Sequence, residues 1–191
     1  MRFTKITDNA ESEAASSSTA VEMLLGCHTR IRHYVQLSLT LAGAENEPLK
    51  EIAEAATAIF RYFSTALPLH EADENKSIFP RLRSAQPAGG LVREAAEIMV
   101  EQHKAIDEMA TELLSLCSSL DHTPERLATL SRRLEHVSRA LEQAFAAHLH
   151  MEETVIFPAL TELLTGEQLE EIRREMQERR TAPRNGIHLV Q

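Results

Sequence analysis

The sequence predicts an all-α protein, an up-down-up-down four-helix bundle with a short extra C-terminal helix. Glycine is scarce in the 191-residue chain, with six residues, while Ala, Leu, Glu and Arg dominate the long stretches between them. Such a composition is typical of helices. No stretch shows the alternation of apolar and polar residues that indicates a strand. The length suits one domain with one well-buried core.

Capping signals define the first two helices. Thr19 followed by Glu22 forms a capping box, which opens a helix over about residues 20–43. Pro48 opens the second helix, since proline is favoured at the first helical position, and this helix ends within residues 83–90, RSAQPAGG. Both stretches carry apolar residues at helical spacing, as one buried face requires.

Two more long stretches complete the predicted bundle. A third helix covers about residues 91–120, and Thr123 before Pro124 begins a fourth helix that runs to about Leu164. Thr165-Gly166 ends it, and a shorter amphipathic helix follows, with apolar positions Leu169, Ile172 and Met176. We therefore expect a flexible N-terminal arm, the bundle, and a short helix with a tail, over residues 1–18, 19–164 and 165–191.

Composition and charge exclude several classes of protein. The net charge of −9, without a dense block of Lys and Arg, argues against nucleic acid or an anionic membrane as the main partner. No apolar run approaches the ~20 residues of a membrane span, and no secretory signal opens the chain, so a cytoplasmic location is the default expectation. The two cysteines, Cys27 and Cys117, are too few for a disulfide framework and favour buried, reduced thiols.

One histidine–glutamate motif occurs twice. Residues 69–80 read LHEADENKSIFP and residues 147–158 read AHLHMEETVIFP. When the two Phe-Pro pairs are aligned, His70 matches His148 and Glu74 matches Glu152. Residues four apart lie on the same face of a helix, so each pair presents an imidazole and a carboxylate in the same direction.

His28 and His103 extend the repeat, because both have apolar neighbours at −4, −3 and +3. His103 follows His28 by 75 residues and His148 follows His70 by 78, so two halves each supply H…HxxxE. A lone inward histidine is more often a hydrogen-bonded core residue than a ligand, but the joint pattern on apolar faces predicts a metal site. The other histidines have no repeat partner and are expected at the surface or in loops: His33, His122, His136, His150 and His188.

Mixed imidazole and carboxylate ligands suit iron, zinc or manganese. Two glutamates suit a pair of ions better than one ion. In two-metal sites the ions lie about 3.5–4 Å apart, and Glu74 and Glu152 could each span both ions. The ExxH motifs of ferritin-like di-iron proteins and the HExxH motif are both missing from the sequence.

His28, HEADENKSIFP, His103 and HLHMEETVIFP resemble the hemerythrin-like HHE cation-binding domain over roughly residues 20–164. The resemblance implies two non-haem iron ions, bridged by carboxylates and an oxo group, inside a four-helix bundle, with manganese or zinc less favoured. Members of the family bind dioxygen or nitric oxide, sense iron or oxygen, or repair iron–sulfur clusters. The implied ligands are His28, His70, Glu74, His103, His148 and Glu152.

The chain departs from the oxygen-carrying hemerythrins, whose third helix supplies two histidines four apart and whose last motif ends HxxxxD. Here the third helix has His103 and Asp107 at that spacing, and the last motif is HxxxE. Each iron then keeps an open position, unless Asp107, Glu71 or Glu153 fills one. Asp107 is the best placed of these, with a salt bridge to Arg32 as the alternative. Open positions favour redox chemistry or nitric oxide binding over reversible oxygen carriage.

We therefore expect a di-iron protein that binds or senses a small diatomic or peroxide ligand, such as oxygen or nitric oxide. The alternatives are iron–sulfur cluster repair by iron donation, a redox enzyme such as a peroxidase, and a metal-free helical interaction protein. No dedicated acid, base or substrate pocket is visible in the sequence. The apolar face of the final helix could pack on the bundle or on a second subunit, so a homodimer is one of the alternatives.

Overall fold

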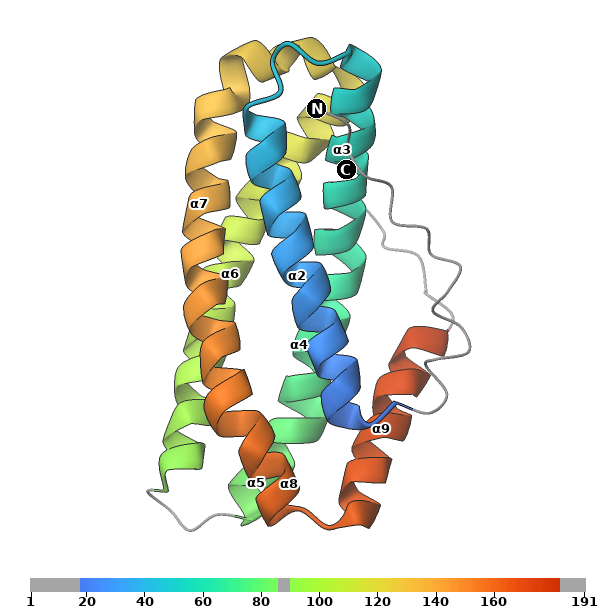
Figure 1. Cartoon of the computed structure of the whole chain (residues 1–191), viewed down its shortest axis with the longest axis vertical. Helices are drawn as coiled ribbons and strands as arrows, with labels where there is room; N and C mark the ends of the chain where they lie inside the picture. The colour runs from blue at the N-terminus through green and yellow to red at the C-terminus, as the bar shows by residue number, and fades with distance from the viewer. Residues whose placement is uncertain (1–17, 86–89, 183–191) are drawn as a thin grey trace, which may run out of the picture.

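The computed structural model describes residues 18–85 and 90–182, and all regular structure in these ranges is helical. This confirms the predicted all-α class. Four long helical segments run side by side along the long axis (Figure 1). Their main helices are α2 (Ala20–Ala42), α3 (Leu49–Arg61), α6 (Leu91–His122) and α7 (Leu127–Met151).

Shorter elements continue the second and fourth segments. The second passes through two π-helical turns, the fourth through one, so neither is the uninterrupted α-helix that we predicted. The continuation of the second segment comprises the π turn Tyr62–Ala66, α4 (Leu67–Asp73), the π turn Glu74–Ile78 and α5 (Phe79–Ala85). That of the fourth comprises the π turn Glu152–Ile156 and α8 (Phe157–Leu163).

The three π turns share one sequence feature, a proline two residues after the turn ends. Proline lacks an N–H group, and its ring clashes with the carbonyl four residues earlier. Here that carbonyl lies inside the π turn, where the widened backbone accommodates the ring. The prolines are Pro68, Pro80 and Pro158.

The four long segments pack around a shared interior. α2 contacts α3 and α7, and α6 contacts the same two helices. The apolar core forms two clusters, and each long segment contributes to both. One cluster includes Ile31, Leu67, Ile106 and Leu149. The other includes Leu24, Ile78, Met99 and Ile156.

The final helix α9 (Gly166–Thr181) packs on its own bundle, against α2, α4 and the π turn Glu74–Ile78. Thr165 and Gln168 form a capping box at its start. Ile172 and Met176 are buried, as predicted for its apolar face. α9 is therefore part of the wall around the lower end of the bundle (Figure 1).

Some local expectations were wrong. Leu25, the apolar neighbour three residues before His28, is 41% exposed. Thr123 makes no side-chain cap, and a short 3₁₀ turn, Pro124–Arg126, precedes α7. The predicted arm apart from Ser18, the tail beyond residue 182 and the end of the second helix beyond residue 85 lie outside the described residues.

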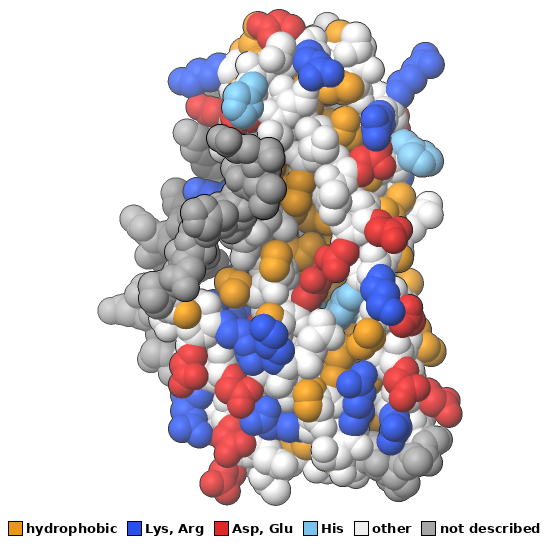
Figure 2. Space-filling view, turned by 180° about the vertical axis from the view of Figure 1, so that it is seen from behind, with side chains coloured by type: hydrophobic (Ala, Val, Ile, Leu, Met, Phe, Trp, Pro, Cys, Tyr) orange, Lys and Arg blue, Asp and Glu red, His pale blue; other side chains and the backbone are white. Residues whose placement is uncertain are grey.

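The surface carries both signs of charge. Acidic and basic side chains are interspersed over the face seen in Figure 2, in keeping with 29 acidic against 20 basic residues. Cys27 and Cys117 are free and buried, as expected.

None of the helices within the described ranges combines the length and the apolar character that crossing a membrane requires.

Candidate metal centre

The six candidate ligands converge in the polar layer between the two apolar clusters, and each of them is at most 5% exposed. The two glutamates are the first residues of two π turns, and the histidines stand on the α-helices. α2 supplies His28, α4 His70, α6 His103 and α7 His148, while the π turns supply Glu74 and Glu152.

Each glutamate places one oxygen toward each half of the chain. Glu74 Oε1 lies 3.0 Å from His70 Nε2. Its Oε2 lies 2.9 Å from His103 Nε2, in the second half. A carboxylate so placed can bridge two cations.

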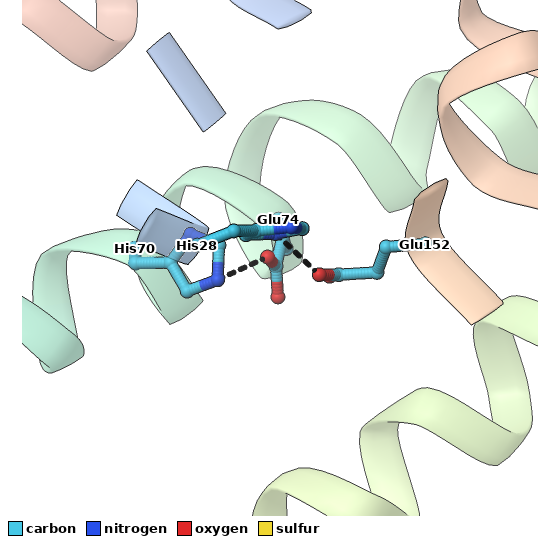
Figure 3. A group of neighbouring side chains, drawn as sticks. All are labelled: His28, His70, Glu74 and Glu152. Atoms are coloured by element: carbon cyan, nitrogen blue, oxygen red, sulfur yellow. Dashed lines mark ion pairs between the residues drawn. The ribbon is translucent and has the colours of Figure 1, made fainter. Parts of the chain in front are cut away.

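Glu152 repeats this arrangement from the opposite side. Its Oε2 lies 2.7 Å from His28 Nε2. Its Oε1 lies 3.5 Å from His148 Nε2. Figure 3 shows the ion pairs of Glu152 with His28 and of Glu74 with His70, which face one another. The ligand atoms form two groups that share Glu74: one adds His28, His70 and Glu152, and the other adds His103 and His148.

Most atoms that point into the centre lack hydrogen-bond partners; the exceptions are Nε2 of His103 and of His148, which lie 3.2 Å apart and share a hydrogen bond. The atoms without a partner include Nε2 of His28 and of His70, and both oxygens of Glu74 and of Glu152. Their short contacts lack hydrogen-bond geometry, and burying polar atoms in that state is costly. Unpaired imidazole nitrogens and carboxylate oxygens are, however, what iron, manganese or zinc takes as ligands. The residues therefore fit bound divalent metal.

Burial shifts the ionisation of the candidate ligands. It lowers the pKa of His70 to about 3 and that of His103 to about 4, so both imidazoles are neutral at neutral pH. Burial, together with the charge of Glu152, raises the pKa of Glu74. Burial acts in the same sense on Glu152, but the close approach of His28 outweighs it and lowers the pKa of Glu152 to about 2. Bound cations would require both carboxylates to be deprotonated.

The Phe of each Phe-Pro pair packs on a histidine from the other half. Phe157 stacks on His28 with ring centroids 5.1 Å apart and planes at 29°. Phe79 lies over His103 at 6.2 Å and 25°. Both rings lie against the imidazoles and orient them, a role that the Phe-Pro motif alone does not indicate.

The outer nitrogens of two histidines are held by residues of the second half. His28 Nδ1 lies 2.7 Å from Glu153 Oε1, and Arg32 Nη2 donates to the same oxygen at 2.8 Å. His148 Nδ1 lies 3.0 Å from Gln102 Oε1. Sequence reasoning missed Gln102, although its place directly before His103 was a usable signal.

The three additional candidate ligands lie outside the two groups of ligand atoms. Glu153 binds the outer side of His28. Asp107 is exposed and lies beside Glu71, whose pKa rises to about 8 because of burial and of the Asp107 charge. The alternative prediction for Asp107, a salt bridge to Arg32, was wrong, because Arg32 pairs with Glu153 instead.

The histidines without a repeat partner lie away from the centre. His122, His136 and His150 are exposed, and His33 is half-buried beside Tyr34. His188 lies outside the described residues.

Comparison with known proteins agrees with this architecture. A protein of Haemophilus influenzae described as uncharacterized is 24% identical over 172 residues, which cover 87% of this chain and 92% of that protein. The hemerythrin HHE cation-binding domain matches the chain twice, over residues 19–97 and 94–182, so each match contains one H…HxxxE set. Together these matches cover most of the chain, which belongs to the hemerythrin HHE cation-binding domain family.

Proposed function

We propose that this chain is an up-down-up-down hemerythrin-like bundle that holds two non-haem iron ions and binds or senses a small diatomic or peroxide ligand. One observation carries the proposal: Glu74 and Glu152 each present one oxygen to His28 or His70 and the other to His103 or His148. A single ion would leave one pair of histidines and two buried oxygens unpaired.

The ligands divide by position. His28 and His70 would hold one ion and His103 and His148 the other. Glu74 belongs to both groups of ligand atoms, and Glu152 approaches the second through its Oε1, 3.5 Å from His148 Nε2, so both glutamates would bridge the ions. Iron, when bound, supplies one-electron redox chemistry and coordination positions for a small ligand. Zinc and manganese accept the same donor atoms, and the family makes iron the first choice.

The surroundings of the centre favour a small ligand. The six side chains are buried, and apolar clusters lie on both sides of them. Phe79 and Phe157 place aromatic rings against the imidazoles. Dioxygen, nitric oxide and hydrogen peroxide are small enough to cross such packing during its fluctuations, whereas a larger or charged substrate is excluded.

The same burial ranks the alternatives. An iron donor must release its metal readily, but here none of the six inner ligands is more than 5% exposed. Release would require the helices to open. The burial of the six ligands therefore supports binding or sensing over iron donation for cluster repair.

The test uses protein loaded with Fe²⁺ without oxygen and titrated with nitric oxide or dioxygen. The expected result is an optical change that saturates at a fixed ratio of ligand to protein. A titration that leaves the spectrum unchanged would reject the proposal. Rapid transfer of iron to a chelator would favour donation, and repeated consumption of peroxide with a reductant would favour an enzyme.

A further inference from the structure

The two halves of the centre differ outside the six inner residues. Alignment of the motifs pairs Glu153 with Asn75, and the matching spacing after the first histidine of each half pairs Arg32 with Asp107. The inner residues are identical at every paired position, whereas these outer residues are a carboxylate against an amide and a cation against an anion.

In the first half, the outer nitrogen of His28 contacts a charged acceptor. Glu153 Oε1 lies 2.7 Å from His28 Nδ1, and Arg32 holds the same oxygen at 2.8 Å. A carboxylate only accepts hydrogen bonds, so it keeps the His28 proton on Nδ1 and leaves the Nε2 lone pair facing the centre. Stacking by Phe157 fixes the plane of the same ring.

In the second half, the equivalent contact is weak and neutral. Asn75 Nδ2 lies 3.5 Å from His103 Nδ1, at the limit of a hydrogen bond. An amide can present either its oxygen or its nitrogen, so it does not fix which nitrogen of His103 carries the proton. Asp107, at the position of Arg32, brings no positive charge to steady a carboxylate there.

The other two histidines have no charged acceptor either. Gln102, a neutral amide, contacts His148 Nδ1 at 3.0 Å. His70 Nδ1 is buried without a hydrogen bond. Among the described residues, His28 is thus the one candidate ligand whose outer nitrogen meets a carboxylate.

We propose that Glu153, held by Arg32, is a positioning residue that makes the two metal positions unequal, so that the position of His28 and His70 binds its cation more tightly. Hydrogen bonds to charged groups are roughly twice as strong as neutral ones, and a carboxylate behind an imidazole raises its basicity and fixes its orientation. The inference rests on the proposed two-metal site.

The experiment titrates the full chain with Co²⁺ against a chromophoric chelator. The wild type is expected to bind two ions with affinities at least about tenfold apart. Glu153→Gln should weaken the tighter ion by about 10- to 100-fold and leave the weaker one unchanged. Arg32→Gln should have a smaller effect of the same kind, and Asn75→Ala should change neither affinity more than about threefold.

Glu135→Gln is the matched control for charge. Glu135 lies on α7 and pairs with Arg139 at 2.9 Å, but both side chains are exposed, so this substitution removes an equal charge away from the centre. Its metal affinities should equal those of the wild type. The melting temperature of each metal-free variant shows whether the fold is retained.

A spectroscopic readout separates positioning from general structure. Co²⁺ shifts the resonance of an imidazole N–H on a bound histidine, and a strong hydrogen bond protects that proton from exchange with water. The wild type should show one well-protected shifted N–H, assigned to His28, that moves and exchanges faster in Glu153→Gln. The Asn75→Ala variant should retain it.

The outcomes distinguish the two proposals. Equal affinities in the wild type, or unchanged affinities and N–H signals in Glu153→Gln, would overturn the role of Glu153 and leave the two-metal site standing. A wild-type chain that takes up neither Co²⁺ nor Fe²⁺ would overturn both.

Discussion

The first half of the chain, which carries His28, His70 and Glu74, and the second half, which carries His103, His148 and Glu152, are alike at the centre and unlike around it. Inside, matching residues occupy matching places and each glutamate reaches across to the other half. Outside, the partners of the histidines differ in charge, in length and in hydrogen-bonding capacity.

This difference teaches which positions the centre constrains. Each glutamate contacts histidines of both halves, so a change at either glutamate would alter the contacts of both halves. The outer residues each contact one histidine or one helix and can differ independently. The same contrast holds at Asp73, which is buried and paired with α9, whereas its equivalent in the second half is Met151.

The largest expected effect comes from removing a shared ligand. Glu152→Ala should lower the affinity for both ions by about 100-fold or more, because one oxygen is lost from each position. Metal content by elemental analysis and circular dichroism would measure binding and fold. Glu162→Ala, at an exposed position of α8, is the control. A variant that keeps one ion at full affinity would show that Glu152 serves one half alone.

The next largest effect concerns Asp73, a buried carboxylate of the first half that has no charged counterpart in the second half. Asp73 is fully buried, with Arg179 Nη1 at 2.7 Å and Arg180 Nη2 at 2.6 Å. Replacing both arginines with Gln should lower the free energy of unfolding by about 3–5 kcal/mol, since a buried carboxylate loses its cations. Met151→Leu is a conservative change at the position of the second half that is equivalent to Asp73. It should lower the free energy of unfolding by less than about 1.5 kcal/mol. Equal effects in urea unfolding would contradict this asymmetry.

The pH dependence of the metal-free protein tests the burial of the imidazoles. Burial lowers the pKa of His103 to about 4, so between pH 6.5 and 4 the unfolded chain binds a proton that the folded chain does not. His103 therefore lowers stability as the pH falls through this window, by about 1 kcal/mol per pH unit.

The measurement compares wild type with His103→Gln by urea unfolding at several pH values. The stability of the wild type relative to the variant should decrease as the pH falls from 6.5 to 4. His122→Gln, at an exposed site on the same helix, should leave the pH dependence unchanged. A difference that does not vary with pH would mean that His103 is solvated in the folded chain.

The smallest expected effect concerns Asp107. Burial and then the charge of Asp107 raise the pKa of Glu71 to about 8, so the folded chain binds the extra proton between pH 4.5 and 8 and stability falls as the pH rises. Asp107→Asn should reduce this fall, as measured by unfolding at pH 6 and pH 9. Its metal content and optical spectrum should stay those of the wild type. A lost ion would make Asp107 a ligand after all.

Sequence reasoning reached the helices and the inner residues because both depend on local rules. Spacing of four places His70 and Glu74 on one face of a helix whatever the rest of the fold does. The capping residue Thr19 acts within one turn, and the structure contains the capping box predicted for it. The repeated H…HxxxE pattern then predicted that the two halves form one shared site.

The missed features depend on contacts across the bundle. Stacking of Phe157 on His28 and the contact of Gln102 with His148 join residues more than 40 positions apart. Spacing within one helix says nothing about such pairs. The π turns are different, because the prolines after them were visible in the sequence. Proline inside a long helical pattern was a usable signal that the helix changes its winding at Glu74 and Glu152.

The central claim is that the two halves build one centre for two ions, and the most direct measurement is the number of iron ions per chain. Protein purified without added metal, then loaded with Fe²⁺ without oxygen and desalted, should contain close to two irons by elemental analysis. Its visible absorption after exposure to air should disappear on anaerobic reduction. A folded chain that retains no metal, or saturates at one ion, would contradict the claim.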